Sequence, residues 1–143
     1  MKKINLELSP DQYKELLRLV YSGNWILDEP ENIVLNDLVQ MIFSQAKVAS
    51  HEKLVSFDDN MQLYMPSDDF DDEMVDIIED FEDECFWSHL SYRLAERDAG
   101  RQAGQEFEKM NLEEKLVMLE RINEKYVSEF DENGLENIEI KNS

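Results

Sequence analysis

The feature that most constrains the fold is a stretch of negative charge in the middle of the chain. Residues 54–92 contain 13 aspartate and glutamate residues and no lysine or arginine. On either side, residues 1–53 combine 6 basic with 8 acidic residues, and residues 93–143 combine 8 with 13. A carboxylate is almost never buried without a partner, and the net charge of −20 opposes compaction through self-repulsion. The central stretch must therefore fold with one side in water.

A long helix is predicted from Ser67 or Asp68 to about Ala99, through most of this acidic stretch. Gly100 and Gly104 weaken any continuation, because glycine is a poor helix former. Apolar residues recur at alternating steps of four and three, which is the period of one helix face. They are Met74, Ile78, Phe81 and Cys85, with Phe86, Leu90 and Leu94 on an adjacent row.

The same helix carries a row of carboxylates. Asp72, Asp76, Asp80 and Glu84 recur every four residues, so they lie one above the other, and Asp83 extends this surface. Like charges at this spacing repel by about 0.2–0.5 kcal/mol per pair. The helix dipole favours acids only within the first turn, so it does not account for the row beyond Asp72. The row is either a solvated face or a surface that a basic partner would neutralise.

The last part of this helix is basic. Arg93, Arg97 and Arg101 also recur every four residues. Two copies of the helix packed antiparallel would match acid with base twice, and a symmetric dimer supplies that arrangement. The three arginines are therefore possible homodimer contacts. The alternative is that they pair with acids of their own chain.

Two further helices are predicted in the first third of the chain. Ser9 fits the N-cap, Pro10 the first helical position, and Gln12 completes a capping box. Gly23 is expected to end this first helix. The second begins near Pro30 and is apolar on nearly every side, which predicts a central buried helix. Its apolar residues are Ile33, Val34, Leu35, Leu38, Val39, Met41, Ile42, Phe43, Ala46 and Val48.

The last helix is predicted to begin after Asn111, which forms a second capping box with Glu114, and to end near Asn133. Residues 3–8 alternate between apolar and polar side chains, as in a half-buried strand. Residues 135–140 suggest a last short strand. We expect these two terminal strands to pair beside the helices.

The sequence therefore predicts a mainly α fold (α+β), with about four helices and a minor two-stranded element formed by the N- and C-terminal strands. A length of 143 residues suits a single domain over residues 1–143. Residues 50–67 stay open. Leu54, Val55 and Phe57 fit either a short strand or the end of a helix, and turn-forming residues follow them.

No residue pattern specifies a cofactor, and none is predicted. The segment that begins at Asp69 lacks the glycine and the glutamate that an EF-hand loop requires. Cys85 and His89 stand four residues apart, as two metal ligands on a helix can. His51 is the only other histidine, so a core cysteine beside an ordinary histidine is the preferred interpretation. Catalytic residues and metal ligands are therefore not assigned.

The composition also limits the cellular compartments and the kinds of partner that we expect for this protein. A single cysteine excludes an internal disulfide and fits a reducing compartment. Residues 1–7 lack the apolar run of a signal peptide, and no stretch reaches the roughly 18 apolar residues that span a bilayer. We expect a cytoplasmic protein without membrane contact. Direct nucleic-acid binding is not expected, because an acidic protein repels phosphates.

These features favour a non-enzymatic interaction protein whose carboxylate-rich helix engages a basic partner, as small acidic inhibitors, immunity proteins and nucleic-acid mimics do. The expected partner-binding residues are Asp72, Asp76, Asp80, Asp83 and Glu84. One alternative is a homo-oligomeric protein that binds a small ligand or a divalent ion in a pocket. Another is a structural subunit of a larger assembly, which would expose an apolar patch rather than a charged one.

Overall fold

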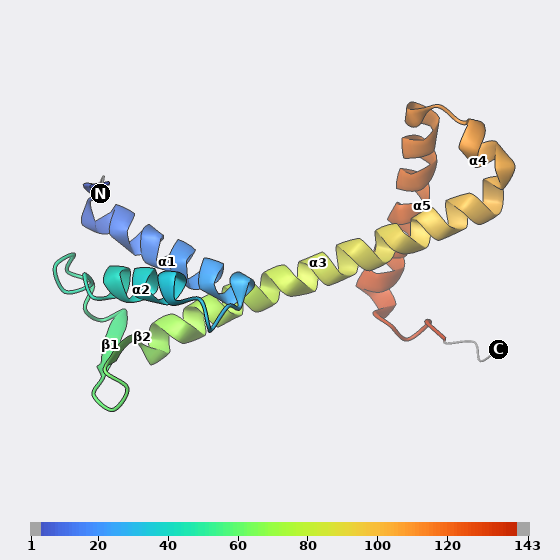
Figure 1. Ribbon diagram of the computed structural model, residues 1–143. Coiled ribbons are helices and arrows are strands. Elements are labelled where there is room, and N and C mark those ends of the chain that lie inside the picture. Colours follow the sequence, from blue (N-terminus) through green and yellow to red (C-terminus); the bar gives the residue numbers. More distant parts are fainter. Residues whose placement is uncertain (1–3, 140–143) are drawn as a thin grey trace. The chain divides into compact units, whose positions relative to one another are not determined.

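Residues 4–139 are described by the computed structural model, and they form five helices and one two-stranded antiparallel sheet (Figure 1). The prediction of a mainly α fold with a minor two-stranded element is confirmed. In chain order the elements are α1 (Pro10–Leu27), α2 (Ile33–Phe43), β1 (Val55–Asp58), β2 (Leu63–Pro66), α3 (Asp68–Ala103), α4 (Gln105–Lys109) and α5 (Leu112–Asn133).

The chain divides into two compact units, Met1–Glu79 and Asp80–Ser143. The N-terminal unit contains α1, α2, both strands and the first part of α3. The C-terminal unit contains the rest of α3 with α4 and α5. Helix α3 is continuous across the boundary. The single domain expected over residues 1–143 stays a prediction.

Helix α1 begins as its sequence predicts. The Ser9 hydroxyl accepts a hydrogen bond from the Gln12 N–H (3.2 Å), and the Gln12 side chain accepts one from the Ser9 N–H (2.9 Å), so the capping box is confirmed. The predicted stop at Gly23 is wrong. The helix continues to Leu27 and ends at Asp28, which adopts the left-handed conformation with a φ of 44°. A glycine inside a helix costs only about 1 kcal/mol, so packing of the neighbouring turns can carry the helix through it.

The core of the N-terminal unit joins α1, α2 and the start of α3. Two tyrosines add polar contacts to it: the Tyr13 hydroxyl donates to the carbonyl of Ile42 (2.6 Å), and the Tyr21 hydroxyl donates to Asp71 (2.7 Å). Burial raises the pKa of both Tyr13 and Tyr21 to about 12, so both phenols are neutral near pH 7. The buried side chains are Tyr13, Leu17, Phe43, Ala46, Phe70 and Met74.

Residues 50–67, which the sequence leaves open, contain a β-hairpin. Phe57 on β1 faces Tyr64 on β2, with ring centroids 4.9 Å apart. The other edge of β2 is covered by α2. The Gln40 side-chain amide donates to the Tyr64 carbonyl (3.0 Å) and accepts from the Tyr64 N–H (2.7 Å). Gln40 thus takes the place of a further strand, and it ties the hairpin to α2.

Helix α2 is not the central buried helix that its composition predicts. It begins at Ile33, after the N-cap Asn32, and its one buried residue is Phe43. On its outer side, Val34 and Met41 are 80% and 59% exposed. One apolar face packs on the core, but the described part of this small unit has no further layer to cover the opposite face.

The strands predicted at the chain ends are also wrong. Residues 4–8 and 135–139 form no strand, and Lys3 and Ile140 lie outside the described residues. Ile4 is 89% exposed, so the alternation of apolar and polar residues does not bury this side chain in a core. Two short strands alone are marginal in water. The sheet forms instead between segments that are close in sequence, where residues 59–62 make the connection.

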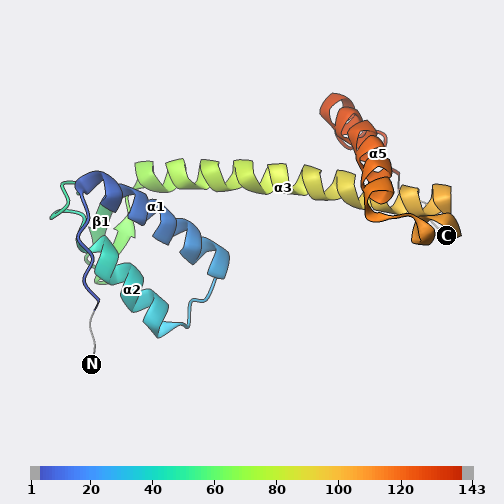
Figure 2. The ribbon, with the colours of Figure 1, turned by 90° about the horizontal axis from the view of Figure 1, so that it is seen from above.

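The C-terminal unit packs α5 against the second part of α3 (Figure 2). The predicted capping box at its start is confirmed, because Asn111 and Glu114 exchange two hydrogen bonds of 3.0 Å. Helix α3 runs past Gly100 to Ala103 and is followed by Gly104, which has a φ of 52°. Small side chains on α3 allow a close approach of α5. The buried cluster consists of Ala95, Ala99, Leu119 and Ile122.

Replacing Gln40 with alanine is expected to lower the free energy of unfolding by about 1–3 kcal/mol, because the part-buried Tyr64 N–H and carbonyl lose their partner. Gln40→Glu should also be destabilised, since its carboxylate still accepts from the N–H but sets a second oxygen against the Tyr64 carbonyl. Urea denaturation measures both changes, and amide exchange at Tyr64 should accelerate in Gln40→Ala. Gln45→Ala, at an exposed position after α2, is the control. A Gln40→Ala protein as stable as this control would contradict the role of the amide.

Candidate interaction surfaces

The carboxylate row of α3 is exposed at every position. Asp72 and Asp76 belong to the N-terminal unit, and Asp80, Asp83 and Glu84 belong to the C-terminal unit. Within residues 4–139, no lysine or arginine nitrogen lies within 4.0 Å of these five carboxylates. Their negative charge is therefore not neutralised by the described part of the chain. Their role in partner binding stays a prediction.

The fold itself uses some of the neighbouring acids. Glu73 lies 3.8 Å from Arg18 on α1, and Asp83 accepts a hydrogen bond from the indole N–H of Trp87 (3.1 Å). These contacts give two carboxylates of the acidic stretch a structural role. Among the described residues, four acids of the row form no ion pair with a lysine or arginine and no side-chain hydrogen bond, namely Asp72, Asp76, Asp80 and Glu84.

Phe81 places an aromatic ring among these carboxylates. The sequence pattern assigns it to the core row with Met74 and Ile78, but those two side chains are buried whereas Phe81 is 60% exposed. Its chain neighbours, Asp80 and residues 82–84, are all acidic, which is the signal that separates it from the core row. Large aromatic side chains at the centre of a polar rim are typical anchors of protein interfaces.

The three arginines of α3 have acidic partners on their own helix. Arg93 lies 3.7 Å from Glu96, and Arg97 and Arg101 lie 2.8 and 3.6 Å from Asp98. These ion pairs are the arrangement that the alternative to a dimer predicts. A homodimer contact through the arginines stays a prediction.

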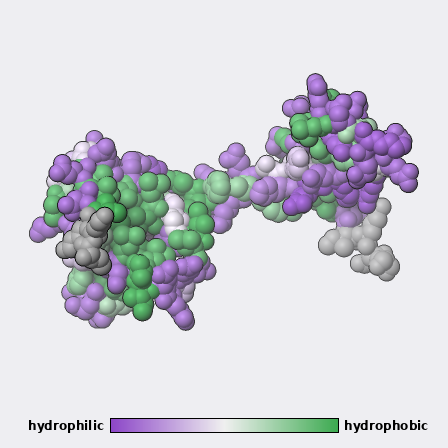
Figure 3. Space-filling model, turned by 45° about the horizontal axis from the view of Figure 1, so that its top comes forward, coloured by the Kyte–Doolittle hydropathy of each residue, from purple (hydrophilic) through white to green (hydrophobic). Residues whose placement is uncertain are grey.

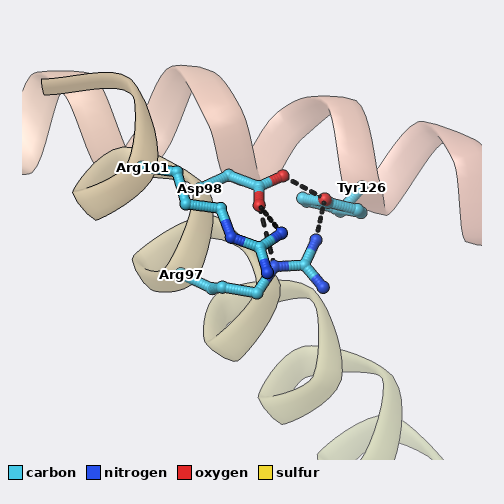
Figure 4. Close-up of polar contacts among 4 residues, drawn as sticks. All are labelled: Arg97, Asp98, Arg101 and Tyr126. Atoms are coloured by element: carbon cyan, nitrogen blue, oxygen red, sulfur yellow. Dashed lines mark hydrogen bonds and ion pairs between the residues drawn. The ribbon is translucent and has the colours of Figure 1, made fainter. Parts of the chain in front are cut away.

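Asp98 is the centre of a polar network that joins α3 to α5 (Figure 4). The Tyr126 hydroxyl donates to Asp98 and accepts from Arg97 Nη2 at 3.0 Å. Hydrogen bonds from Arg97 and Tyr126 hold the pKa of Asp98 below its ordinary value. Burial, and then the bond to Asp98, raises the pKa of Tyr126. Because its bonds are charge-assisted and lie where two helices pack, the network stabilises the C-terminal unit.

A groove of about 590 Å³ lies in the N-terminal unit, between the end of α1, α2 and β2. Aromatic rings of Tyr21, Trp25 and Tyr64 line it, and its two charged residues, Asp28 and Glu29, are both carboxylates. The groove is not visible in the sequence, because its lining comes from three separate elements. The sequence does contain one sign of it, namely the acidic pair Asp28 and Glu29 directly after α1.

The N-terminal unit also exposes a broad apolar surface (Figure 3). On α2, Val34, Leu38 and Met41 follow the spacing of one helix face, and all three are exposed. Single exposed apolar residues are normal, but a row of them along one helix is typical of a contact surface. This apolar row is what the interpretation as an assembly subunit predicts.

Metal ligands do not cluster in the described part of the chain. Within residues 4–139, no three histidine, cysteine, aspartate or glutamate side chains are placed so that they could hold a metal ion. Cys85 is half-buried and His89 is exposed. No described helix combines the length and the apolar character that a membrane span requires.

Comparisons of this chain with protein-family models, with curated proteins and with solved structures found no match. Its function must therefore be inferred from its own surfaces. Three surfaces are candidates: the carboxylate row with Phe81 on α3, the apolar row on α2, and the acidic groove of the N-terminal unit.

Replacing Asp98 with asparagine should lower the stability of the C-terminal unit by about 1 kcal/mol at pH 7, because the ion pairs with Arg97 and Arg101 are lost and the hydrogen bond from Tyr126 becomes a neutral one. A carboxyl whose pKa is lowered by folding contributes stability above its ordinary pKa of 3.8 and loses it as the pH falls. The difference between wild type and Asp98→Asn should therefore shrink between pH 5 and about pH 3. Urea midpoints at both pH values measure it. A difference that stays constant with pH would show that the charge of Asp98 does not contribute.

Proposed function

We propose that this chain is a non-enzymatic interaction protein whose carboxylate row on α3 binds a basic surface of another protein. The observation that carries the proposal is the absence of a cationic partner at Asp76, Asp80 and Glu84 within the described residues. The arginines of the same helix are paired with other acids. A basic partner would remove the repulsion that the row creates along the helix.

Electrostatics and packing would have different roles in such a complex. The acidic surface would steer a basic partner into contact and make the association rate fall with salt. Phe81 would supply apolar area that becomes buried inside the charged rim, which slows dissociation. A nucleic-acid-binding protein is one class of partner, because the basic site that it presents to phosphates would also accept a row of carboxylates.

A second candidate is a structural subunit of a larger assembly. The exposed apolar row of Val34, Leu38 and Met41 favours it. The two candidates differ in their response to salt, because apolar contacts are maintained when ionic strength rises and exposed charge contacts weaken. The homo-oligomeric, ligand-binding alternative stays a prediction, and the aromatic-lined groove of the N-terminal unit is where its small ligand would bind.

Reversing three unpaired acids in Asp76→Lys/Asp80→Lys/Glu84→Lys should weaken partner binding by at least about 10-fold, because like charges then face each other. The measurement is a pull-down from source-cell lysate, eluted with a salt gradient and followed by an affinity titration of the retained protein. Wild type should retain a basic protein that moderate salt releases.

The matched control is Glu120→Lys/Glu124→Lys/Asp131→Lys on α5, which changes the net charge equally at three other exposed positions. It should retain the partner, and circular dichroism should show both variants folded. Equal loss of binding in the two variants would mean that net charge, and not the row on α3, attracts the partner. Retention of the same proteins by the α3 variant would refute the proposed site.

Phe81→Ala should weaken the same complex by about 10-fold or more while leaving the protein folded, since the ring is largely exposed. The loss should appear mainly as faster dissociation in surface plasmon resonance. Val117→Ala, at an exposed apolar position of α5, serves as the control. Unchanged dissociation of the Phe81→Ala protein would remove Phe81 from the interface.

A further inference from the structure

The groove of the N-terminal unit has a negative end that the fold does not neutralise. Asp28 caps the C-terminus of α1, Glu29 follows it, and both side chains line the groove and are exposed. A helix C-terminus already carries partial negative charge, which a basic residue in the last turn commonly offsets. The last turn of α1 has no basic residue, and no lysine or arginine lines the groove. Two carboxylates and the helix dipole therefore favour a cation at this end.

Aromatic rings beside the carboxylates also favour the binding of a cation. Trp25 is 47% exposed, and its ring stacks on Tyr21 with centroids 6.4 Å apart. Tyr21 is held in turn by its hydrogen bond to Asp71 and by an edge contact with Phe70 (5.8 Å). An exposed indole face attracts an ammonium or guanidinium group, and more strongly once water is excluded. The aromatic wall is thus fixed before anything binds.

The floor of the groove is apolar. Phe43 is buried at its base, and the half-buried side chains of Val20 and Val39 flank it. Gln40 also lines the groove, and its amide donates one hydrogen bond to Tyr64 and accepts one from it. The backbone of β2 at Tyr64 is therefore closed to an added strand, and an occupant would make its contacts through side chains.

From this charge and lining, we propose that the groove binds a short segment of another protein in which an arginine or lysine adjoins a large apolar side chain. The cation lies between Trp25 and the carboxylates of Asp28 and Glu29, and the apolar side chain covers Phe43. A volume of about 590 Å³ suits one or two side chains of a peptide rather than a whole helix. This site is separate from the carboxylate row of α3 and does not depend on it.

The test uses the full chain with Trp87→Phe, which leaves Trp25 as the only tryptophan. The probe is a capped, fluorophore-labelled pentapeptide of alternating leucine and arginine, titrated at about 0.15 M salt, where charges beyond roughly 8 Å are screened. Peptides of alternating leucine and glutamate, and of alternating serine and arginine, are the comparison probes. Polarisation reports affinity, and the emission of Trp25 reports contact with the groove.

Asp28→Asn/Glu29→Gln removes the two groove charges while preserving the fold. Asparagine tolerates the left-handed conformation of Asp28, and glutamine can still accept the hydrogen bond that Asn32 donates to Glu29 (2.7 Å). The matched control is Asp131→Asn/Glu132→Gln, which removes two exposed charges from α5. Acids of the α3 row are intact in both variants, so the outcome is independent of the proposed function.

The leucine–arginine peptide should bind and shift the emission of Trp25. Its affinity should fall at least about 10-fold in Asp28→Asn/Glu29→Gln and less than twofold in the control. Both comparison peptides should bind at least about 10-fold more weakly, since each lacks the cation or the apolar side chain. No binding, binding without a change in Trp25 emission, or equal weakening in the two variants would each overturn the proposal.

Discussion

Helix α3 supplies buried residues to each unit, and its charge decides where along the helix that can happen. Phe70 and Met74 enter the core of the N-terminal unit, and Ala95 and Ala99 enter that of the C-terminal unit. Carboxylates without partners stay in water because their desolvation is too costly. The carboxylates of residues 76–84 are accordingly all exposed, whereas Ile78 on the same turns is buried.

Structural features formed by residues three or four positions apart were predictable from the sequence. The capping boxes at Ser9 and Asn111 are examples, because each joins residues three positions apart. Exposure of the outer face of α2 was not predictable, since it depends on how many neighbours the folded unit provides. The pairing of Gln40 with Tyr64 spans 24 residues, and in the sequence Gln40 is only one polar position on an apolar helix.

The candidate surfaces, too, were predictable only in part. The spacing of Asp76, Asp80 and Glu84 is visible in the sequence, and the helix presents these side chains as expected. Asp98 has the same chemical character, yet two arginines and a tyrosine surround it and give it a structural role. Charge alone therefore does not distinguish a binding carboxylate from a stabilising one. The distinction depends on what lies within reach of the carboxylate: both cations at Asp98 come from its own helix, and the packing of α5 on α3 adds the hydroxyl of Tyr126.

Asp28 shows how folding and recognition compete at a single position. Its left-handed conformation suits glycine, and aspartate adopts it at a cost of about 1 kcal/mol. Aspartate also has the unfavourable sign for the end of a helix. Glycine at this position would make the N-terminal unit more robust and would also weaken the field at the mouth of the groove. Selection for heat resistance and selection for binding a cation would therefore favour different residues at the end of α1, which is a trade-off familiar from functional sites in other proteins.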